Sequence, residues 1–313
     1  PDILSLYVDH DPIPLENVEI LNQWWSMEEI IREEYLSFVT YQQSIYGVPF
    51  AASGSVILIN TELLDQVGYQ APQKDSWTYE EFMDYIQGFE RAKKEREGDE
   101  NEAYLTFDSY IGKGSLDIMP ILLSDGGQIY QKEEDRFAFY QPEMVSGLQK
   151  LHNIKSKVTT HQDFGNRSKG DVYQYFFKNK KTLVLAGDSS LIHTLEGLKD
   201  QGEGFPYLVM PFPTGSMGIP IWYSHHLDSY AVMKDEDEEK LKVVIQFLES
   251  LLEEESQYSL QSLRKFPVHK GVKDLYEEEP LFHGWFQKGY EYQTHPLHPN
   301  WEGIEYHIID CIQ

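Results

Sequence analysis

The sequence predicts an α/β protein, because short apolar segments rich in strand-forming residues alternate with segments whose apolar residues have helical spacing. Residues 56–59 form an apolar run typical of a buried strand. A capping box follows, with Thr78 three residues before Glu81. After the capping box, the sequence predicts a helix, and its buried face is formed by Tyr79, Phe82, Met83, Ile86 and Phe89. Alternation of this kind along the chain favours an α/β fold over separate all-β and all-α units.

Further elements are predicted in the first half of the chain. Residues 3–8 read as a strand, and Ser26 with Glu29 forms a second capping box for a helix that ends near residue 38. Three more segments follow: a strand over 104–107, an apolar helix over 118–123 that ends before a glycine pair, and a small hairpin over 128–140.

The second half continues the alternation. The predicted elements are strands over 182–186, 208–211 and 230–233, and helices over 142–157 and 236–252. The helix over 142–157 is expected to bury a stripe of Val145, Leu148, Leu151 and Ile154. A last helix over about 300–312 carries the single cysteine, Cys311, which we expect to be a packed apolar residue rather than a nucleophile.

The strongly negative net charge makes some classes of function unlikely. The 313 residues carry a formal net charge of −26, a field that repels nucleic acid and anionic lipid, so no nucleic-acid partner is expected. No apolar run approaches the roughly 18 residues of a membrane span. One cysteine cannot form an intramolecular disulfide, which fits the cytoplasm or the outside of a bacterium that does not rely on disulfides. Because the chain starts at Pro1 and not at a methionine, we expect that an upstream segment has been removed.

Motifs for several chemistries are missing. The sequence has no GxxxxGK[ST] loop, no GxGxxG after a strand, no GxSxG elbow and no HExxH. Histidines 225, 226, 295 and 298 lack cysteine partners and metal-ligand spacing. Tyr290 and Tyr292 lack the strand pattern that would put two iron-binding phenolates on one face. We therefore predict no metal and no cofactor. A glycosidase carboxylate pair stays open, because 52 acidic residues always offer one.

The remaining candidates are polar and aromatic residues placed mainly at predicted strand ends, where open α/β sheets bind ligands. They are Asp9, His10, Ser53, Ser115, Asp188, Ser189, Trp222, Tyr223, His225, His226 and Trp301. Carboxylates bind sugar hydroxyls by charge-assisted hydrogen bonds, and aromatic rings cover the apolar faces of pyranoses. Each residue taken alone is more often structural, but the combination favours a carbohydrate ligand.

Short motifs also follow one another in a recognisable order. They are Pro1-Asp2-Ile3, Tyr46-Gly-Val-Pro-Phe50, Ile59-Asn60, Trp77-Thr78-Tyr-Glu-Glu81, Ser124-Asp125-Gly126-Gly127, Ala186-Gly187-Asp188, VMPFPTG over 209–215, YAVMK over 230–234, FPVHK over 266–270, and His298-Pro299-Asn300-Trp301. This order resembles the maltose-type extracellular solute-binding proteins of ABC importers. No single motif is specific, but the series covers nearly the whole chain.

The resemblance implies a two-lobed α/β fold of the periplasmic-binding-protein type II, with several hinge crossings and the ligand in the cleft between the lobes. It implies a first lobe of residues 1–107 and 226–265 and a second lobe of residues 108–225 and 266–313. Family members begin with a further strand and helix, which are expected to be absent here. Ligand contacts with both lobes would then favour their closure by a hinge motion.

The resemblance also implies roles for single residues. Asp9 falls where the family has a carboxylate for sugar hydroxyls, Ser53 falls at another cleft position, and Trp301 keeps a stacking ring. Leu116 and Ser189 stand where the maltose binder has a tyrosine and a tryptophan, which argues against maltodextrin as the ligand. Replacement contacts are expected at the second crossover from Trp222, Tyr223, His225 and His226.

The implied function is non-enzymatic. A monomeric receptor would capture a carbohydrate-like solute outside the membrane and deliver it to ABC transporter permease subunits. Its location would be extracytoplasmic, either as a cell-surface lipoprotein of a Gram-positive bacterium or in a periplasm. The alternatives are a carbohydrate-active enzyme, a metal- or iron-binding receptor on a similar two-lobed fold, and a sensor domain that has lost transport.

Overall fold

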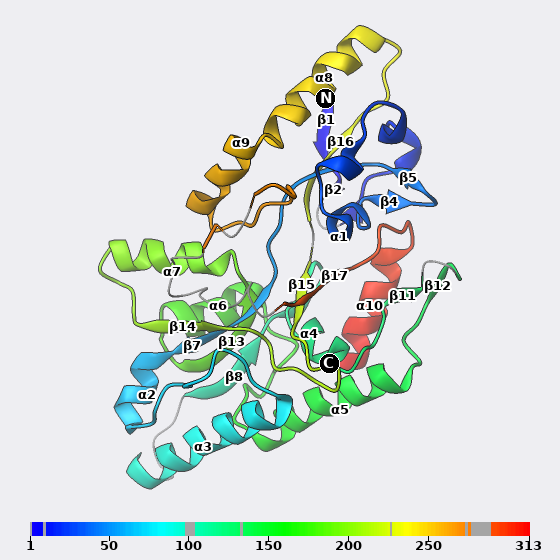
Figure 1. The fold of residues 1–313 in the computed structure, drawn as a ribbon. Helices are drawn as coiled ribbons and strands as arrows, with labels where there is room; N and C mark the ends of the chain where they lie inside the picture. The colour runs from blue at the N-terminus through cyan, green and yellow to red at the C-terminus, as the bar shows by residue number, and fades with distance from the viewer. Residues whose placement is uncertain are drawn as a thin grey trace.

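The computed structural model describes residues 2–8, 11–97, 104–131, 134–225, 227–272, 275–276 and 289–313. These residues form two lobes, one above the other in Figure 1. We call the described residues within 2–52 and 227–276 the upper lobe, and those within 55–225 and 289–313 the lower lobe. The amino terminus lies in the upper lobe and the carboxyl terminus in the lower lobe (Figure 1).

The upper lobe is built on a three-stranded antiparallel sheet in the order β1 (Ile3–Ser5), β16 (Asp228–Val232) and β6 (Val48–Ala51). Two hairpins pair β2 (Tyr7–Val8) with β3 (Asp11–Pro12), and β4 (Thr40–Tyr41) with β5 (Ser44–Ile45). The helices are α1 (Glu33–Leu36), α8 (Glu238–Leu251) and α9 (Glu254–Tyr258), with short 3-10 helices at Leu15–Asn17, Leu21–Gln23, Met27–Glu29 and Ser259–Leu263.

The lower lobe is built on a four-stranded sheet in the order β14 (Tyr207–Met210), β7 (Ser55–Asn60), β13 (Thr182–Asp188) and β8 (Leu105–Ser109). β7 is antiparallel to both of its neighbours, whereas β13 and β8 are parallel. Smaller pairs join β9 (Ile111–Gly112) to β10 (Ser115–Leu116), β11 (Tyr130–Gln131) to β12 (Arg136–Phe137), and β15 (Ile221–Ser224) to β17 (Glu291–Thr294). The helices are α2 (Thr61–Val67), α3 (Tyr79–Glu97), α4 (Met119–Leu123), α5 (Pro142–Lys157), α6 (Lys169–Phe177), α7 (Leu191–Asp200) and α10 (Trp301–Ile312).

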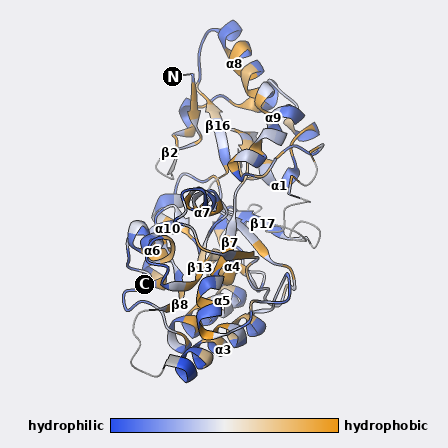
Figure 2. Cartoon of the chain, turned by 90° about the vertical axis from the view of Figure 1, so that its left-hand side faces the viewer, coloured by the Kyte–Doolittle hydropathy of each residue, from blue (hydrophilic) through white to orange (hydrophobic). Residues whose placement is uncertain are grey.

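The predicted strand over 56–59 lies at the centre of the lower lobe. It is β7, and every one of its residues is buried. Val56 and Leu58 belong to the same apolar core as residues of α6 and α7, whereas Ile57 and Ile59 share a core with residues of α2 to α5. A strand covered on both faces needs apolar residues at successive positions, which explains the continuous run. Figure 2 shows the hydrophobic residues of this lobe gathered around β13 and α4.

The capping box predicted before α3 is confirmed. The backbone N–H of Glu81 donates to Thr78 Oγ1 over 3.2 Å, and the N–H of Thr78 donates to Glu81 Oε2 over 2.9 Å. Both groups would otherwise lack a partner in the first turn of the helix. The hairpin over 128–140 and the helices over 142–157 and 300–312 are also present, as β11–β12, α5 and α10.

The sheet pairings place the lobe boundary differently from the predicted one at residue 107. β7 precedes residue 107, yet it is hydrogen-bonded to β13 and β14 of the lower lobe. Phe266 and His269, which the predicted second lobe includes, bridge to Ala52 and Ile31 of the upper lobe. Because paired strands share one sheet, we propose that the lobes divide at the chain crossing near residue 54 and not at residue 107.

Three local predictions are wrong. The helix expected from Ser26 to residue 38 is interrupted, because Ile31 bridges to His269 and Arg32 is extended, so that only α1 and a 3-10 helix remain. In α5, Val145 is exposed, and Gly147 packs against Leu122 of α4 instead. The contact is so close that a Cβ on Gly147 would lie 2.2 Å from the Leu122 carbonyl oxygen. Close approach of α4 therefore sets the buried face of α5. Finally, Cys311 is exposed.

Candidate functional site

Hydrogen bonds attach the first chain crossing between the lobes, at residues 54 and 55, to neighbouring segments of the lower lobe. The N–H of Gly54 donates to Ser189 Oγ over 3.2 Å, and the N–H of Ser189 donates back to the Gly54 carbonyl over 2.8 Å. Ser55 Oγ donates to the Tyr223 carbonyl on β15 over 2.9 Å. The crossing is thus tied to the turn after β13 and to the strand that leads into the second crossing.

The predicted stacking residue Trp222 packs directly on this crossing. A Cβ on Gly54 would lie 2.3 Å from the indole nitrogen, so only glycine permits the ring to approach so closely. The ring is 3 % exposed and meets Phe266, Tyr290 and Tyr292 edge-on, with centroids 4.7, 5.0 and 5.3 Å away. The Trp222 ring is therefore buried inside the junction between the lobes.

Tyr292 lies on strand β17, so the prediction that this segment lacks a strand is wrong.

The most polar part of the junction is centred on Asp117, which is completely buried. Its Oδ1 lies 2.8 Å from His225 Nε2 and accepts the Ser115 hydroxyl over 3.0 Å. The Tyr173 hydroxyl points to Oδ2 over 3.5 Å. Because the Leu116 N–H donates to His225 Nδ1 over 3.1 Å, the proton of a neutral imidazole lies on Nε2, beside the carboxylate. The buried carboxylate thus has two hydroxyls and an imidazole around it.

Two tyrosines extend this cluster. Burial raises the pKa of Tyr173 well above its usual value, and the carboxylates of Asp117 and Asp188 raise it further, so its hydroxyl keeps its proton. Lys169 Nζ lies 5.7 Å from the centroid of the Tyr173 ring and 5.8 Å from that of the Tyr110 ring. Both rings are half-buried. Hydroxyls, a buried carboxylate and two ring faces therefore lie close together in this part of the lower lobe.

A layer of aromatic rings also joins the two lobes. Trp301 is 2 % exposed and stacks against His295, with centroids 5.0 Å apart and planes 15° apart. His295 in turn meets Tyr7 of the upper lobe edge-on at 5.1 Å. Trp301 therefore lies beneath His295, and a contact of its own ring with a ligand stays a prediction.

The predicted site residues divide into groups. Ser115, Asp188 and His225 gather around Asp117 and Tyr173. A second group forms the ties at the junction, and its members are Ser189, Trp222 and Tyr223. Ser53, which is 8 % exposed, immediately precedes the crossing glycine. The predictions for Asp9, His10 and His226 lie outside the described residues.

Sequence reasoning missed Asp117, Tyr173 and His295. The signal for Asp117 was an acidic residue within the otherwise apolar stretch 116–123, which indicates a buried carboxylate with partners. Ser115 is a neighbour in the chain, but Tyr173 is 56 positions from Asp117. No spacing rule connects such residues, so the folded chain was needed to bring them together.

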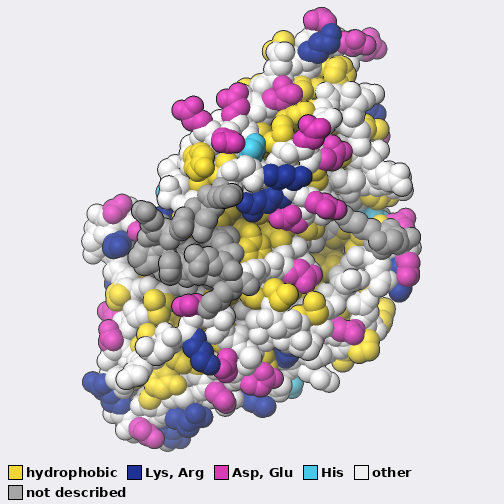
Figure 3. Space-filling view, in the orientation of Figure 1, with side chains coloured by type: hydrophobic (Ala, Val, Ile, Leu, Met, Phe, Trp, Pro, Cys, Tyr) yellow, Lys and Arg dark blue, Asp and Glu magenta, His cyan; other side chains and the backbone are white. Residues whose placement is uncertain are grey.

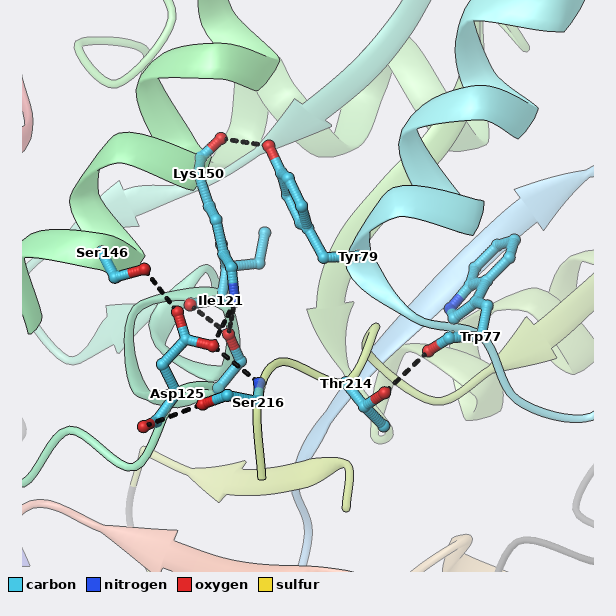
Figure 4. A network of polar contacts seen from close by, with 9 residues as sticks. Trp77, Tyr79, Ile121, Asp125, Ser146, Lys150, Thr214 and Ser216 are labelled. Carbon is cyan, nitrogen blue, oxygen red and sulfur yellow. Dashed lines mark hydrogen bonds and ion pairs between the residues drawn. The ribbon is translucent and has the colours of Figure 1, made fainter. Parts of the chain in front are cut away.

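A second polar network supports the lower lobe (Figure 4). Asp125 lies 2.7 Å from Lys150 Nζ, and it accepts the Ser146 hydroxyl over 2.6 Å and the Ser216 N–H over 2.8 Å. The Tyr79 hydroxyl donates to the Lys150 carbonyl over 2.7 Å. The network joins α3, α5, the turn after α4 and the loop before β15, and so fixes the strand that carries Trp222.

The described residues show neither a metal cluster nor a membrane span. Within them, no group of three or more His, Cys, Asp and Glu side chains is arranged to hold a metal ion. No helix in the same ranges is both long and apolar enough to cross a membrane. Figure 3 shows hydrophobic side chains exposed in the hollow between the two lobes, in line with a site for an organic ligand.

Two lobes joined by chain crossings, with a polar and aromatic junction between them, define a two-lobed α/β fold. Comparison with family models gives the class: residues 7–284 match the bacterial extracellular solute-binding protein family, and the chain belongs to that family. The predicted family resemblance and two-lobed fold are thereby confirmed. A sequence search among curated proteins finds no match.

Solved structures with the same fold span the whole chain. A cyclic alpha-maltosyl-1,6-maltose binding protein from Arthrobacter globiformis has a TM-score of 0.76 at 17 % identity and is covered over 78 % of its length. The maltose-bound MalE3 of T. maritima has a TM-score of 0.69 at 18 % identity, with 78 % covered. An ABC substrate-binding protein from Listeria monocytogenes in complex with cycloalternan has a TM-score of 0.68 at 16 % identity, with 80 % covered. In each case the match covers 100 % of this chain.

Proposed function

We propose that this protein captures a sugar or oligosaccharide outside the cytoplasmic membrane and delivers it to the permease subunits of an ABC importer. The observation that carries the proposal is the Asp117 cluster, where a buried carboxylate holds the Ser115 and Tyr173 hydroxyls beside two half-buried tyrosine rings. Hydroxyl groups and flat ring faces are the two features that a pyranose needs. The named ligands of the fold relatives, a cyclic maltosyl-maltose, maltose and cycloalternan, support a saccharide of this kind.

The role that we propose for each residue follows from how exposed its side chain is. Tyr173, Tyr110 and Asp188 are partly accessible and would contact the sugar. Asp117 is completely buried, so it would act as a positioning residue that fixes the direction of the Tyr173 hydroxyl. A bound sugar that touches both lobes would favour their closure.

We also propose that the protein is a monomeric receptor without enzymatic activity, held at the outer cell surface by a lipid anchor or contained in a periplasm. Membership of an extracellular family supports the location. Light scattering after size exclusion tests the oligomeric state, and cell fractionation with and without detergent tests the anchor. A mass above that of one chain, or recovery in the cytosol, would contradict these points.

The proposal is tested by isothermal titration of the protein with linear malto-, isomalto-, cello- and xylo-oligosaccharides and with cyclic glucans, followed by chromatography of each mixture. We expect saturable binding of at least one saccharide, with no change in the saccharide itself. Formation of shorter products would establish a carbohydrate-active enzyme instead. Binding of a metal ion such as Fe³⁺ or Zn²⁺, with no response to any saccharide, would favour a metal receptor.

A further inference from the structure

Asp108 and Arg167 form an ion pair inside the lower lobe. Arg167 Nη1 contacts Asp108 Oδ2, and the two side chains are 6 % and 1 % exposed, in that order. The other Asp108 oxygen accepts the backbone N–H of Ser109 over 3.0 Å, and Arg167 Nη2 donates to the Asp171 carbonyl over 3.0 Å. Because the desolvation of a pair this deeply buried offsets most of its attraction, stability alone does not explain the pair.

The two partners belong to the two segments that carry the half-buried tyrosines of the proposed sugar site. Asp108 lies on β8, and Tyr110 follows two positions later. Arg167 immediately precedes the N-cap of α6, the helix that carries Tyr173. Lys169, at the start of the same helix, has its Nζ 5.8 and 5.7 Å from the centroids of the two tyrosine rings. The ion pair thus attaches the start of α6 to the end of β8.

Further contacts hold the Arg167 guanidinium in one orientation. Its central carbon lies 4.6 Å from the centroid of the half-buried Tyr175 ring on α6, and that ring meets His161 edge-on at 5.9 Å. Among the described residues, the titratable groups around the guanidinium are therefore Asp108, Asp171, Tyr175 and His161. Asp108 is the carboxylate in direct contact with it.

We propose that Asp108 and Arg167 are positioning residues of the sugar site, which hold the Tyr110 and Tyr173 rings at the spacing that a bound pyranose needs. The proposal rests on the proposed function and deepens it, because it names residues on which the affinity depends without a contact to the sugar. A guanidinium is bound more strongly by a carboxylate than by a neutral acid or amide. Loss of the charge on Asp108 would therefore let the start of α6 move relative to β8, and the affinity would fall.

The charge on Asp108 changes within an accessible range of pH. Burial raises the pKa of Asp108 from 3.8 to about 6, although Arg167 and the Ser109 N–H lower it. A further acid, Glu90 of α3, reaches β8 two positions earlier, where it accepts the Thr106 hydroxyl over 2.8 Å. Because the folded-state pKa of Asp108 is raised, its proton uptake favours the folded state as the pH falls through 6 toward about 4. Acid should thus weaken sugar binding and, through the same group, stabilise the fold.

The test compares wild type with Asp108→Asn, each titrated at pH 7.5 and at pH 5.0 with the oligosaccharide that wild type binds most tightly. We expect wild type to bind about tenfold more tightly than the variant at pH 7.5, which is the effect of one charge-assisted hydrogen bond. The advantage should fall to about twofold at pH 5.0, where most of the free wild type carries a protonated Asp108. Asp117, Lys169 and His225 occur in both proteins, so their own titration cancels in the ratio.

Urea denaturation of the same samples separates positioning from support of the fold. Relative to Asp108→Asn, wild type should become more stable between pH 7.5 and pH 5.0 while its advantage in binding disappears. Parallel losses of affinity and stability would make the pair a scaffold element. An affinity ratio that does not change with pH, or that stays near one, would overturn the proposal while leaving the receptor intact.

Substitutions of Arg167 test the other partner. Arg167→Met should bind about tenfold more weakly than wild type at pH 7.5. Arg167→Lys keeps the charge but loses the Asp171 bond and the Tyr175 contact, so its affinity should lie between the two. Lys242→Met, which breaks an exposed ion pair with Glu239 on α8 of the upper lobe, should bind as wild type does. Unchanged affinity of Arg167→Met would contradict the positioning role. If wild type binds no saccharide at either pH, the proposed function itself fails, and the positioning role fails with it.

Discussion

Two aspartates of the lower lobe have their carboxylates engaged by several donors, yet the donors differ in kind. Asp125 is paired with the Lys150 ammonium group at 2.7 Å and is supported by Ser146 and the Ser216 N–H. Asp117 is surrounded instead by an imidazole and two hydroxyls, from His225, Ser115 and Tyr173. The donors to Asp125 thus include a cation, whereas those that reach Asp117 from Ser115 and Tyr173 are uncharged hydroxyls.

The difference assigns the two networks to different tasks. A carboxylate neutralised by a cation has a strong, fixed partner, and the Asp125 network joins helices and a loop that carry the site without being part of it. A carboxylate held by hydroxyls fixes the direction of their protons and leaves their oxygens able to accept a hydrogen bond from a ligand. We therefore expect the Asp125 network to govern stability and the Asp117 network to govern binding.

The largest effect is expected from Lys150→Met, which removes the cation and leaves the Asp125 carboxylate without its charged partner. Both side chains of the pair are 12 % exposed, so the unpaired charge is poorly solvated. We expect a loss of about 3 kcal/mol in the free energy of unfolding, measured by urea denaturation, with unchanged saccharide affinity at a temperature where the variant is folded. Lys157→Met, an exposed position at the end of the same helix, is the control. Equal stability of the two variants would contradict the scaffold role of Asp125.

Acid should weaken the same network. Burial alone would raise the pKa of Asp125, but hydrogen bonds from Lys150, Ser146 and the Ser216 N–H outweigh it and lower the pKa from 3.8 to about 2. A carboxyl with a lowered folded-state pKa contributes stability above its unfolded pKa and loses it as the pH falls toward the folded value. The contribution is therefore complete above about pH 4 and lost near pH 2.

The matching measurement compares wild type with Asp125→Asn across pH. We expect wild type to be more stable by about 2 kcal/mol at pH 6, and we expect this gap to close between pH 4 and pH 2. Urea denaturation at each pH gives both free energies. A gap that stays constant down to pH 2 would show that the Asp125 charge does not contribute to the fold.

Asp117→Asn tests the other half of the comparison. The amide can keep its oxygen toward His225 and turn its NH₂ group toward the Tyr173 oxygen, so the fold should survive while the Tyr173 hydroxyl changes direction. We expect saccharide affinity to fall about tenfold, as one charge-assisted hydrogen bond is rearranged. Titration calorimetry and thermal unfolding on the same sample separate the two effects. A loss of stability with unchanged affinity would make Asp117 a scaffold residue like Asp125.

Both networks consist of contacts that the sequence alone could not predict. Features that depend on neighbours in the chain could be predicted, and the buried strand β7 and the capping box of α3 are examples. The order of motifs identified the family, whose model matches residues 7–284. Ser115, Asp188 and His225 were selected as polar residues in the right segments, but the residues that join them, Asp117 and Tyr173, come from positions far apart in sequence.

Two of the wrong predictions have the same cause. The expected helix after Ser26 is broken because Ile31 pairs with His269, and the expected stripe of α5 is rotated because Gly147 lies against Leu122. Both are contacts between distant segments, which override local propensity. The lobe boundary that we propose near residue 54 rests likewise on the pairing of β7 with β13, which no local pattern shows.

The smallest expected effect belongs to the contact that the sequence predicts best. Thr78→Ala removes the hydroxyl that caps α3, at an exposed position, and should lower the free energy of unfolding by about 1 kcal/mol without a change in saccharide affinity. Glu81→Gln, which keeps an oxygen for the Thr78 N–H, should cost less, and thermal unfolding of both variants provides the comparison. If Thr78→Ala proves as damaging as Lys150→Met, local capping would matter as much to this lobe as the long-range network. We expect the opposite order, because a cap stabilises one turn of one helix, whereas the Asp125 network joins several segments that nothing else in their local sequence brings together.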